Sequence, residues 1–205
     1  MVYRRTPGVQ ARLDAQRARL VAAATQQLAE QGYAGCSVAA VARRAGVASG
    51  TVYNHFDGKA ELVAEVFCTL VSREVAAVRT AVEAADDTTT RVTAFAETFA
   101  LRALKSPRLA FALLAEPVDP AIEELRLAFR VAFRDIAATA IAAGVSAGEL
   151  PAQDARVVAA AIVGAIGEAL VGPLSGTPDP AVVATLVAFA LRSLGVRHAV
   201  HAVHT

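Results

Sequence analysis

The chain has 205 residues, which is more than one minimal domain needs, and 55% of them are hydrophobic while only 19% are charged. So low a charged share indicates more buried surface than the core of a monomer explains. The net charge of +1 conceals an asymmetry, because residues 1–60 carry eight Lys/Arg and three Asp/Glu while the rest carries twelve and sixteen. The basic N-terminal part favours a polyanionic partner, since phosphates neutralised by Lys or Arg release counterions; a merely solvated basic surface is the alternative.

The cysteines and the N-terminus predict the compartment. Cys36 and Cys68 lie far apart without a metal-binding or redox spacing, which favours unpaired thiols in a reducing environment. The N-terminus has positive charge but no apolar core of signal-peptide length. The most membrane-like stretch, residues 157–174, contains Glu168 and internal glycines, so we interpret it as a buried helix. We expect a cytoplasmic protein that does not enter a membrane.

In chain order, helical periodicity without alternating strand patterns predicts an all-α fold. The first helix is expected over Gln10–Gln31, with Gly32 at its C-terminal stop. Ser37 is expected to cap a second, short helix that ends at Gly46. A third short helix is expected over Ser49–Phe56, after a tight turn.

Beyond the Asp57-Gly58 break, the pattern predicts a larger helical body. A long helix is expected from Lys59 to about Glu83, followed by a polar linker over residues 86–90. Further breaks are expected at 106–107, 116–120, 144–151 and 172–180, which gives about nine helices in all. We therefore predict two domains: a three-helix head with a flexible N-terminal arm over residues 1–58, and a helical body over 59–205.

The segment from Ser37 to Phe56 has the pattern of a helix-turn-helix, in which the second helix enters the major groove. Val52 and Phe56 are four residues apart and are expected to face inward. The outward positions are then short, polar and rich in hydrogen-bond donors: Ser49, Thr51, Tyr53, Asn54 and His55. A solvated helix face is the alternative interpretation of this set.

The same residues resemble the DNA-binding signature of the TetR family of transcriptional regulators. Four runs of residues show the resemblance, in the order and spacing of the family signature and without insertion or deletion: LVAAA from Leu20, LAEQGY from Leu28, SVAAVARRAGV from Ser37, and GTVYNHFDGKAEL from Gly50. It covers about a quarter of the chain, and the remainder is similar to the family only in helix number. One departure is Ala48, where the family usually has Ser or Thr to cap the recognition helix. Ser49 is the alternative cap, which would compete with base contact.

The resemblance assigns DNA contacts residue by residue. It implies phosphate contacts, which position the head without specifying sequence, for Ser37, Arg44, Tyr53, His55 and Lys59. Base contacts fall to Ser49, Thr51 and Asn54, since Asn bonds adenine in a bidentate manner and a Thr methyl contacts a thymine methyl. A local backbone hydrogen bond is the alternative for Thr51. Arg4 and Arg5 are interpreted as part of a disordered tail rather than a minor-groove arm.

Dimerisation is expected because one small head makes few contacts, and two heads on a palindrome supply affinity and selectivity. The last two helices, about 152–171 and 180–194, are apolar on nearly every face and need cover on all sides. In the family the equivalent pair forms a four-helix dimer interface. The residues predicted for it are Val157, Ala161, Gly164, Ala165, Val183, Leu186 and Val187. Helices central to a monomeric core are the alternative.

A ligand pocket is predicted in the body. Aromatic residues recur at helical spacing on the helices that line the family's pocket, and plain core is the equal alternative. The predicted lining is Phe67, Phe95, Phe99, Arg102, Phe111, Phe129 and Phe133. We interpret the stripe of Arg126, Arg130 and Arg134 as a solvated face, so no acidic ligand is expected. We interpret His198, His201 and His204 as a frayed tail, and expect neither a metal nor a cofactor.

An enzyme is not expected, because the sequence has no nucleophile elbow, phosphate-binding glycine loop or paired-carboxylate motif. The prediction is a ligand-responsive regulator, a repressor by family default, that binds a palindromic double-stranded DNA operator as a homodimer and is released by a small, largely apolar molecule. The alternatives are a helical-bundle small-molecule binding protein and a DNA-binding protein without an effector.

Overall fold

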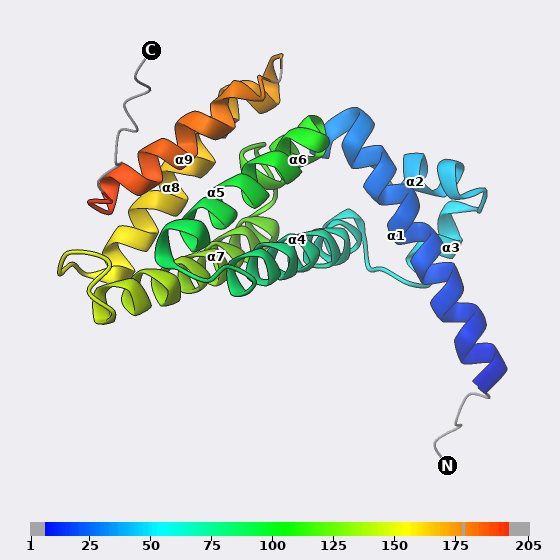
Figure 1. The fold of residues 1–205 in the computed structure, drawn as a ribbon. Coiled ribbons are helices and arrows are strands. Elements are labelled where there is room, and N and C mark those ends of the chain that lie inside the picture. Colours follow the sequence, from blue (N-terminus) through cyan, green and yellow to red (C-terminus); the bar gives the residue numbers. More distant parts are fainter. Residues whose placement is uncertain (1–6, 178, 197–205) are drawn as a thin grey trace. The chain divides into compact units, whose positions relative to one another are not determined.

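The computed structural model describes residues 7–177 and 179–196, and in them it contains nine helices and no strand, as predicted (Figure 1). The helices are α1 (Pro7–Gly35), α2 (Val38–Ala45), α3 (Ser49–Tyr53), α4 (Lys59–Glu83), α5 (Thr88–Lys105), α6 (Pro107–Leu114), α7 (Pro120–Ser146), α8 (Ala155–Ser175) and α9 (Ala181–Ser193). Arg4, Arg5, His198, His201 and His204 lie outside the described residues.

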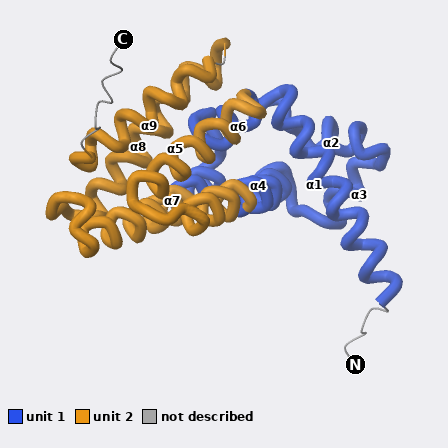
Figure 2. Tube along the Cα trace, in the orientation of Figure 1, with its two compact units in different colours: residues 1–72, 108–127 blue, residues 73–107, 128–205 orange. Residues whose placement is uncertain are grey.

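The chain divides into two compact units (Figure 2). Unit 1 comprises residues 1–72 and 108–127, and so contains α1–α3, the first half of α4, α6 and the start of α7. Unit 2 comprises residues 73–107 and 128–205. Residue 58, where the sequence predicts the domain boundary, lies inside unit 1, and that boundary stays a prediction.

In unit 1, α1 has the predicted apolar face and the predicted glycine break. Leu20, Ala24 and Leu28 are buried against the rest of the unit. Gly32 has φ 66° and ψ −173°, so regular helical geometry stops there and a short turn continues to Gly35. Only glycine adopts a positive φ at little cost, which explains the residue at this stop.

Several predicted helix limits differ from the structure by a few residues. α3 ends at Tyr53, because the chain then tightens into a turn in which the Phe56 N–H donates to the Val52 carbonyl at 3.0 Å. The linker predicted through residue 90 is shorter, because Asp87 caps α5 by accepting from the Thr90 N–H at 2.8 Å. Gly144 does not end α7, which continues to Ser146.

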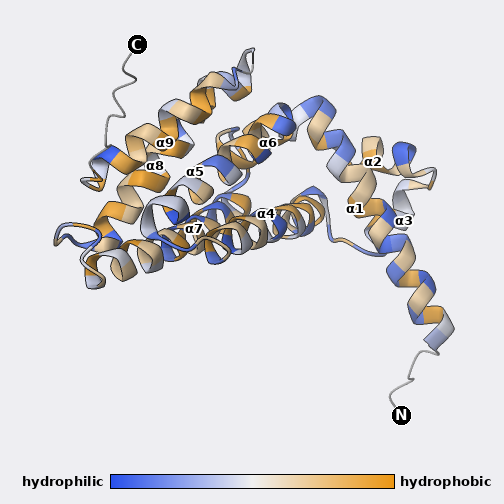
Figure 3. Cartoon of the chain, viewed as in Figure 1, coloured by the Kyte–Doolittle hydropathy of each residue, from blue (hydrophilic) through white to orange (hydrophobic). Residues whose placement is uncertain are grey.

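In unit 2, α5 packs against α9 and α8. Alanines without measurable exposure allow this close approach: Ala96, Ala100, Ala159 and Ala190. Apolar residues run along α8 and α9 (Figure 3). By length and composition α8 is apolar enough to cross a membrane, yet only 33% of its most apolar window is buried in this chain. The interpretation of this stretch as a buried helix holds for the side of α8 that contains Ile162, Ile166 and Leu170, while Val157 and Ala161 on another side are exposed in the single chain.

Candidate nucleic-acid interface

The α2–turn–α3 segment forms the predicted helix-turn-helix. Ser37 caps α2, its Oγ accepting from the Ala40 N–H at 3.2 Å. Gly46 ends α2 in the left-handed conformation at φ 68°, and its N–H donates to the carbonyls of Ala42 and Arg43. A Cβ at Gly46 would meet no atom within 4 Å, so the backbone conformation alone requires glycine there.

The two sides of α3 are separated as predicted. Val52 and Phe56 are buried, with 0% and 1% of their surface exposed, and anchor the helix to unit 1. The opposite side presents Ser49, Tyr53 and Asn54 to solvent, while Thr51 and His55 are half-buried. Tyr53 is 57% exposed, which is unusual for a large aromatic side chain without a role at the surface.

The start of α3 settles which residue caps it. Ala48 occupies the cap position and has no side chain that accepts a hydrogen bond. The alternative that Ser49 caps the helix is therefore wrong, since Ser49 is its first helical residue. No side-chain hydrogen bond of Ser49 occurs within the described part of the chain, and Ser49 is exposed.

Two residues of α1 brace the chain just after α3. The Arg17 guanidinium donates to the His55 carbonyl at 2.7 Å and to Glu65 at 3.2 Å, and it lies 4.2 Å above the centre of the Phe56 ring. Gln16 Oε1 lies 3.0 Å from His55 Nε2. The sequence prediction missed both braces. The available signal was Arg17 itself, a charged residue on the same helical stripe as Leu13, Leu20 and Ala24.

The predicted phosphate contacts differ in how they are held. The Lys59 ammonium lies 3.8 Å above the centre of the Tyr33 ring. Arg44 forms an ion pair with Glu30 on α1 and also donates to Gln27, and the hydrogen bond from Arg44 lowers the pKa of Glu30. Arg44 is thus already paired within unit 1, whereas its neighbour Arg43 is exposed and was not predicted.

Three of the predicted pocket residues form a ring cluster within unit 2. In unit 2, Phe95 stacks on Phe99 at a centroid distance of 6.5 Å, and Phe99 meets the edge of Phe133 at 5.0 Å. Phe129 also belongs to unit 2, while Phe67 and Phe111 belong to unit 1. Arg102, predicted to orient a ligand, is paired with Glu74 at the surface of unit 2.

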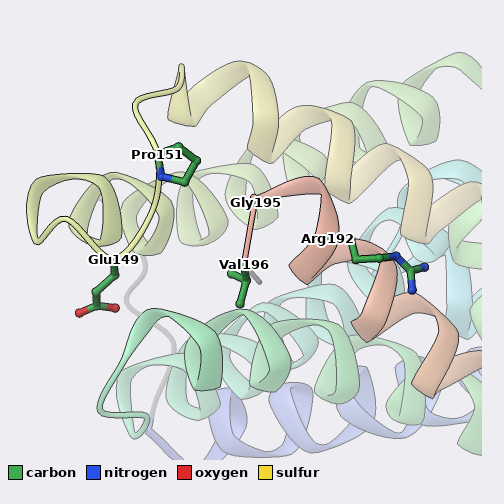
Figure 4. Close-up of a pocket in the computed structure, with 5 residues that line it drawn as sticks. All are labelled: Glu149, Pro151, Arg192, Gly195 and Val196. Carbon is green, nitrogen blue, oxygen red and sulfur yellow. The ribbon is translucent and has the colours of Figure 1, made fainter. Parts of the chain in front are cut away.

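One open hollow lies elsewhere in unit 2, where the α7–α8 loop meets the end of α9 (Figure 4). Its lining residues are Glu149, Pro151, Arg192, Gly195 and Val196. None of these belongs to the predicted pocket. Within the described residues no group of three or more His, Cys, Asp or Glu side chains is arranged to hold a metal ion.

Part of the predicted arginine stripe is not solvated. Arg126 is only 6% exposed and donates to the carbonyls of Leu113 and Glu116 at 2.9 and 2.8 Å. The solvated-face interpretation is therefore wrong for Arg126, because the side chain is used to satisfy the C-terminal end of α6 and the turn that follows. Arg130 is exposed, as that interpretation expects.

The predicted dimer residues on α8 and α9 differ in exposure. Val157, Ala161 and Gly164 form an exposed stripe on α8, with Val157 64% exposed. Val183 and Leu186 are instead buried within unit 2. Ala165 and Val187 are half-buried, and Phe189 on α9, which was not predicted, is 40% exposed.

Residues 20–66 match the family model described as "Bacterial regulatory proteins, tetR family". The matched stretch begins on α1, contains all of α2 and α3, and ends on α4. No curated protein matches this chain.

Solved structures with the same fold cover nearly the whole chain. The fatty acid degradation regulator FadR from Bacillus halodurans is 20% identical, with a TM-score of 0.73 over 85% of this chain and 97% of that one. FadR from Bacillus subtilis in complex with stearoyl-CoA is 18% identical, with a TM-score of 0.76 over 88% and 99%. A putative transcriptional regulator from Pseudomonas aeruginosa is 22% identical, with a TM-score of 0.72 over 89% of both chains. At these identities the likeness concerns the fold alone.

Proposed function

We propose that this chain, whose residues 20–66 match the model of the tetR family of bacterial regulatory proteins, is a member of that family and acts as a cytoplasmic, ligand-responsive repressor that binds a palindromic DNA operator as a homodimer. It regulates transcription and catalyses no reaction. The effector in this proposal is a small, largely apolar molecule whose binding releases the operator.

The observation that carries the proposal is the two-sided α3. Val52 and Phe56 fix the helix from within, and the exposed side offers Ser49, Tyr53 and Asn54. We assign base reading to Ser49, Thr51 and Asn54, because their short side chains carry the donors and acceptors that distinguish base edges in the major groove. The Ser49 hydroxyl does not cap α3, which supports this assignment.

Phosphate contacts fall to residues around the two ends of the helix-turn-helix. We assign them to Ser37, Tyr53, His55 and Lys59, and retain Arg44 subject to release from its ion pair with Glu30. Such contacts set the register of the head on the duplex and supply the salt-dependent part of the affinity. The bonds of Gln16 and Arg17 to His55 support a fixed position for this edge of the head.

The homodimer is proposed from the uncovered apolar face of α8. Val157, Ala161 and Gly164 present a contiguous stripe, and small residues allow a second helix to approach closely. A stripe of this kind on a helix that is 33% buried in the single chain needs a partner, and a second copy supplies one by symmetry. The second copy also brings the second head that a palindrome requires.

The effector class is proposed from the composition of unit 2. The ring cluster of Phe95, Phe99 and Phe133 provides an apolar wall on α5 and α7. The structurally similar FadR from Bacillus subtilis was solved with stearoyl-CoA, a molecule with a long apolar chain. Stearoyl-CoA and shorter acyl-CoA molecules, which join an apolar acyl chain to an anionic CoA group, are therefore first probes for a thermal-shift and operator-release test, and free CoA is the control that separates the contribution of the anionic part.

Selection of bound duplexes from a random DNA pool tests the central proposal. The expected result is a palindrome whose half-sites are about 34–36 Å apart, or a multiple of one helical turn. Asn54→Ala is then expected to relax the preference at one base pair of each half-site, whereas Lys59→Ala weakens all sequences alike and makes the salt dependence shallower. Recovery of no preferred sequence by the unmodified protein would overturn the proposal.

A further inference from the structure

The kink in α1 binds a carboxylate from a segment of unit 1 that is distant in sequence. At Gly32 the helix is interrupted, and the Tyr33 and Ala34 N–H groups donate to Glu116 at 2.8 and 3.5 Å. A Cβ on Gly32 would lie 2.7 Å from Glu116 Oε1 and 2.9 Å from Oε2. Glycine is therefore required twice, for its positive φ and for the approach of this carboxylate.

A second carboxylate of the same segment holds the Tyr33 side chain. The buried Tyr33 hydroxyl donates to Asp119, which lies just before α7. Burial, and then this hydrogen bond, raise the pKa of Tyr33 well above its ordinary value, so the phenol stays protonated and remains a donor. Backbone and side chain of one residue are thus both fixed by the segment 115–119 that connects α6 to α7.

The connector is itself anchored. Arg126 donates to the carbonyls of Leu113 and Glu116, and Arg108 on α6 donates to the Glu30 carbonyl at 2.8 Å. The Arg126 bonds tie α7 to the end of α6 and to the connector, and the Arg108 bond ties α6 to α1. The position of Tyr33 is therefore set by a rigid support.

The Tyr33 ring in turn carries the Lys59 ammonium, 3.8 Å above its centre at the start of α4. A cation over an aromatic face keeps N–H donors on its other side, and it has lost part of its rotamer freedom. We infer that Glu116 and Asp119 are positioning residues for DNA binding, acting through Tyr33 to hold the Lys59 ammonium ready for a phosphate. The inference rests on the proposed function.

The inference predicts a change in DNA affinity opposite in sign to the change that net charge alone predicts. Removing an acidic side chain raises the net charge and by itself strengthens binding to DNA. Loss of the Asp119 acceptor instead frees Tyr33 and Lys59, and the ordering of Lys59 must then occur at the moment of binding. We expect Asp119→Ala to weaken operator binding about fivefold despite its lost negative charge.

The test compares Asp119→Ala with Asp119→Asn, which has the same net charge but keeps an oxygen that accepts from Tyr33. Affinity is measured by fluorescence anisotropy on the duplex that the unmodified protein selects. For Asp119→Asn we expect operator affinity to fall by less than about twofold. Tyr33→Phe should lower operator affinity as much as Asp119→Ala does, and the double variant Tyr33→Phe, Asp119→Ala should show no further loss. Glu124→Gln, at an exposed position on α7, controls for charge alone.

The decisive comparison is made in a Lys59→Gln background, where Asp119→Ala is expected to cause no loss of operator affinity, and at most the small gain that its lost negative charge brings. An equal loss with and without Lys59 would show a merely structural role and overturn the inference, as would equal affinities of the Ala and Asn variants. If Asp119→Ala does not fold, Tyr33→Phe provides the same comparison. Failure of the unmodified protein to select any duplex overturns the proposed function, and with it this inference.

Discussion

Unit 1 and unit 2 are both helical, but different forces fix their geometry. In unit 1, different segments of the chain are joined by directed polar bonds, several of which end on backbone carbonyls; the donors are Arg17, Tyr33, Arg44, Arg108 and Arg126. In unit 2, buried aliphatic and aromatic side chains make up the core, fully buried alanines lie on α5, α8 and α9, and Val157 and Ala161 leave an exposed apolar stripe on α8. A surface that reads DNA requires fixed side-chain directions, whereas a surface that associates with a copy of itself requires apolar area.

The largest loss of stability is expected from Arg126→Met, which removes the central polar support of unit 1 while keeping most of the aliphatic stem. The carbonyls of Leu113 and Glu116 lose their charged donor in a buried place, and the free energy of unfolding should fall by about 3 kcal/mol. Arg130→Met, at an exposed position on the same helix, should change it by less than about 0.5 kcal/mol. Urea denaturation measures both, and equal effects would show that unit 1 does not depend on this support.

The next effect concerns association rather than folding. A Cβ at Gly164 would meet no atom within 4 Å in the single chain, so Gly164→Leu fits the protomer but obstructs a close helix–helix contact. We expect the dimer dissociation constant to rise about a hundredfold, roughly 2.7 kcal/mol, in sedimentation equilibrium. Ala142→Leu adds a similar apolar side chain to an exposed position of α7 and should leave association unchanged. If Gly164→Leu dimerises normally, the α8 stripe is not the interface.

Gly144 contrasts with Gly164, because here the neighbour is inside unit 2. A Cβ at Gly144 would lie 2.4 Å from Thr88 Oγ1, and Thr88 is fully buried. Gly144→Ala should therefore destabilise the fold by about 2 kcal/mol, although alanine favours a helix. Gly172→Ala, which meets nothing, should be neutral or slightly stabilising. Adding Thr88→Ala to Gly144→Ala should restore part of the loss, and no restoration would show that the clash is not its cause.

Local signals explain why most of the fold was predictable. Ser37, Gly46 and the pair Val52 and Phe56 act over a few residues, through a cap, a positive φ and helical spacing. The helix-turn-helix therefore follows from the sequence, and the family match over residues 20–66 agrees with it.

The missed features depend on residues far apart in the chain. Arg17 and His55 are 38 positions apart, and Tyr33 and Glu116 are 83 apart, so no local pattern relates them. Arg126 was interpreted as solvated because its sequence neighbours are charged, while its burial depends on carbonyls of α6 and of the following turn. The helical periodicity did place charged residues on otherwise apolar stripes, and the prediction did not use this signal.

A smaller effect on stability, but a clear one on DNA binding, is expected from Arg17→Met. Its bonds are partly exposed to solvent, with 34% of the Arg17 side chain accessible, so their loss should cost about 1 kcal/mol. The chain after α3 would lose its brace at His55, and operator affinity should fall about tenfold if the brace positions the phosphate contacts. Arg12→Met, an exposed change of equal charge on the same helix, controls for electrostatics in the same anisotropy titration. Equal affinities of the two variants would mean that the brace has no part in binding.

The smallest expected effect is a pH dependence of the stability of unit 2, caused by two carboxylates at the start of α5. The hydrogen bond from the Thr90 N–H lowers the pKa of Asp87 below its ordinary value of 3.8, and the Thr88 side chain, followed by the Thr88 N–H, lowers the pKa of Glu149 below its ordinary value of 4.5. A carboxyl whose pKa is lowered by folding stabilises the fold above its unfolded pKa, and that contribution is lost as the pH falls through the folded value. The double variant Asp87→Asn, Glu149→Gln keeps acceptor oxygens but does not titrate, so its thermal midpoint should lie slightly below that of the unmodified protein at pH 6 and approach it near pH 3. A difference that stays constant across this range would show that the two carboxylates do not stabilise α5 through their charge.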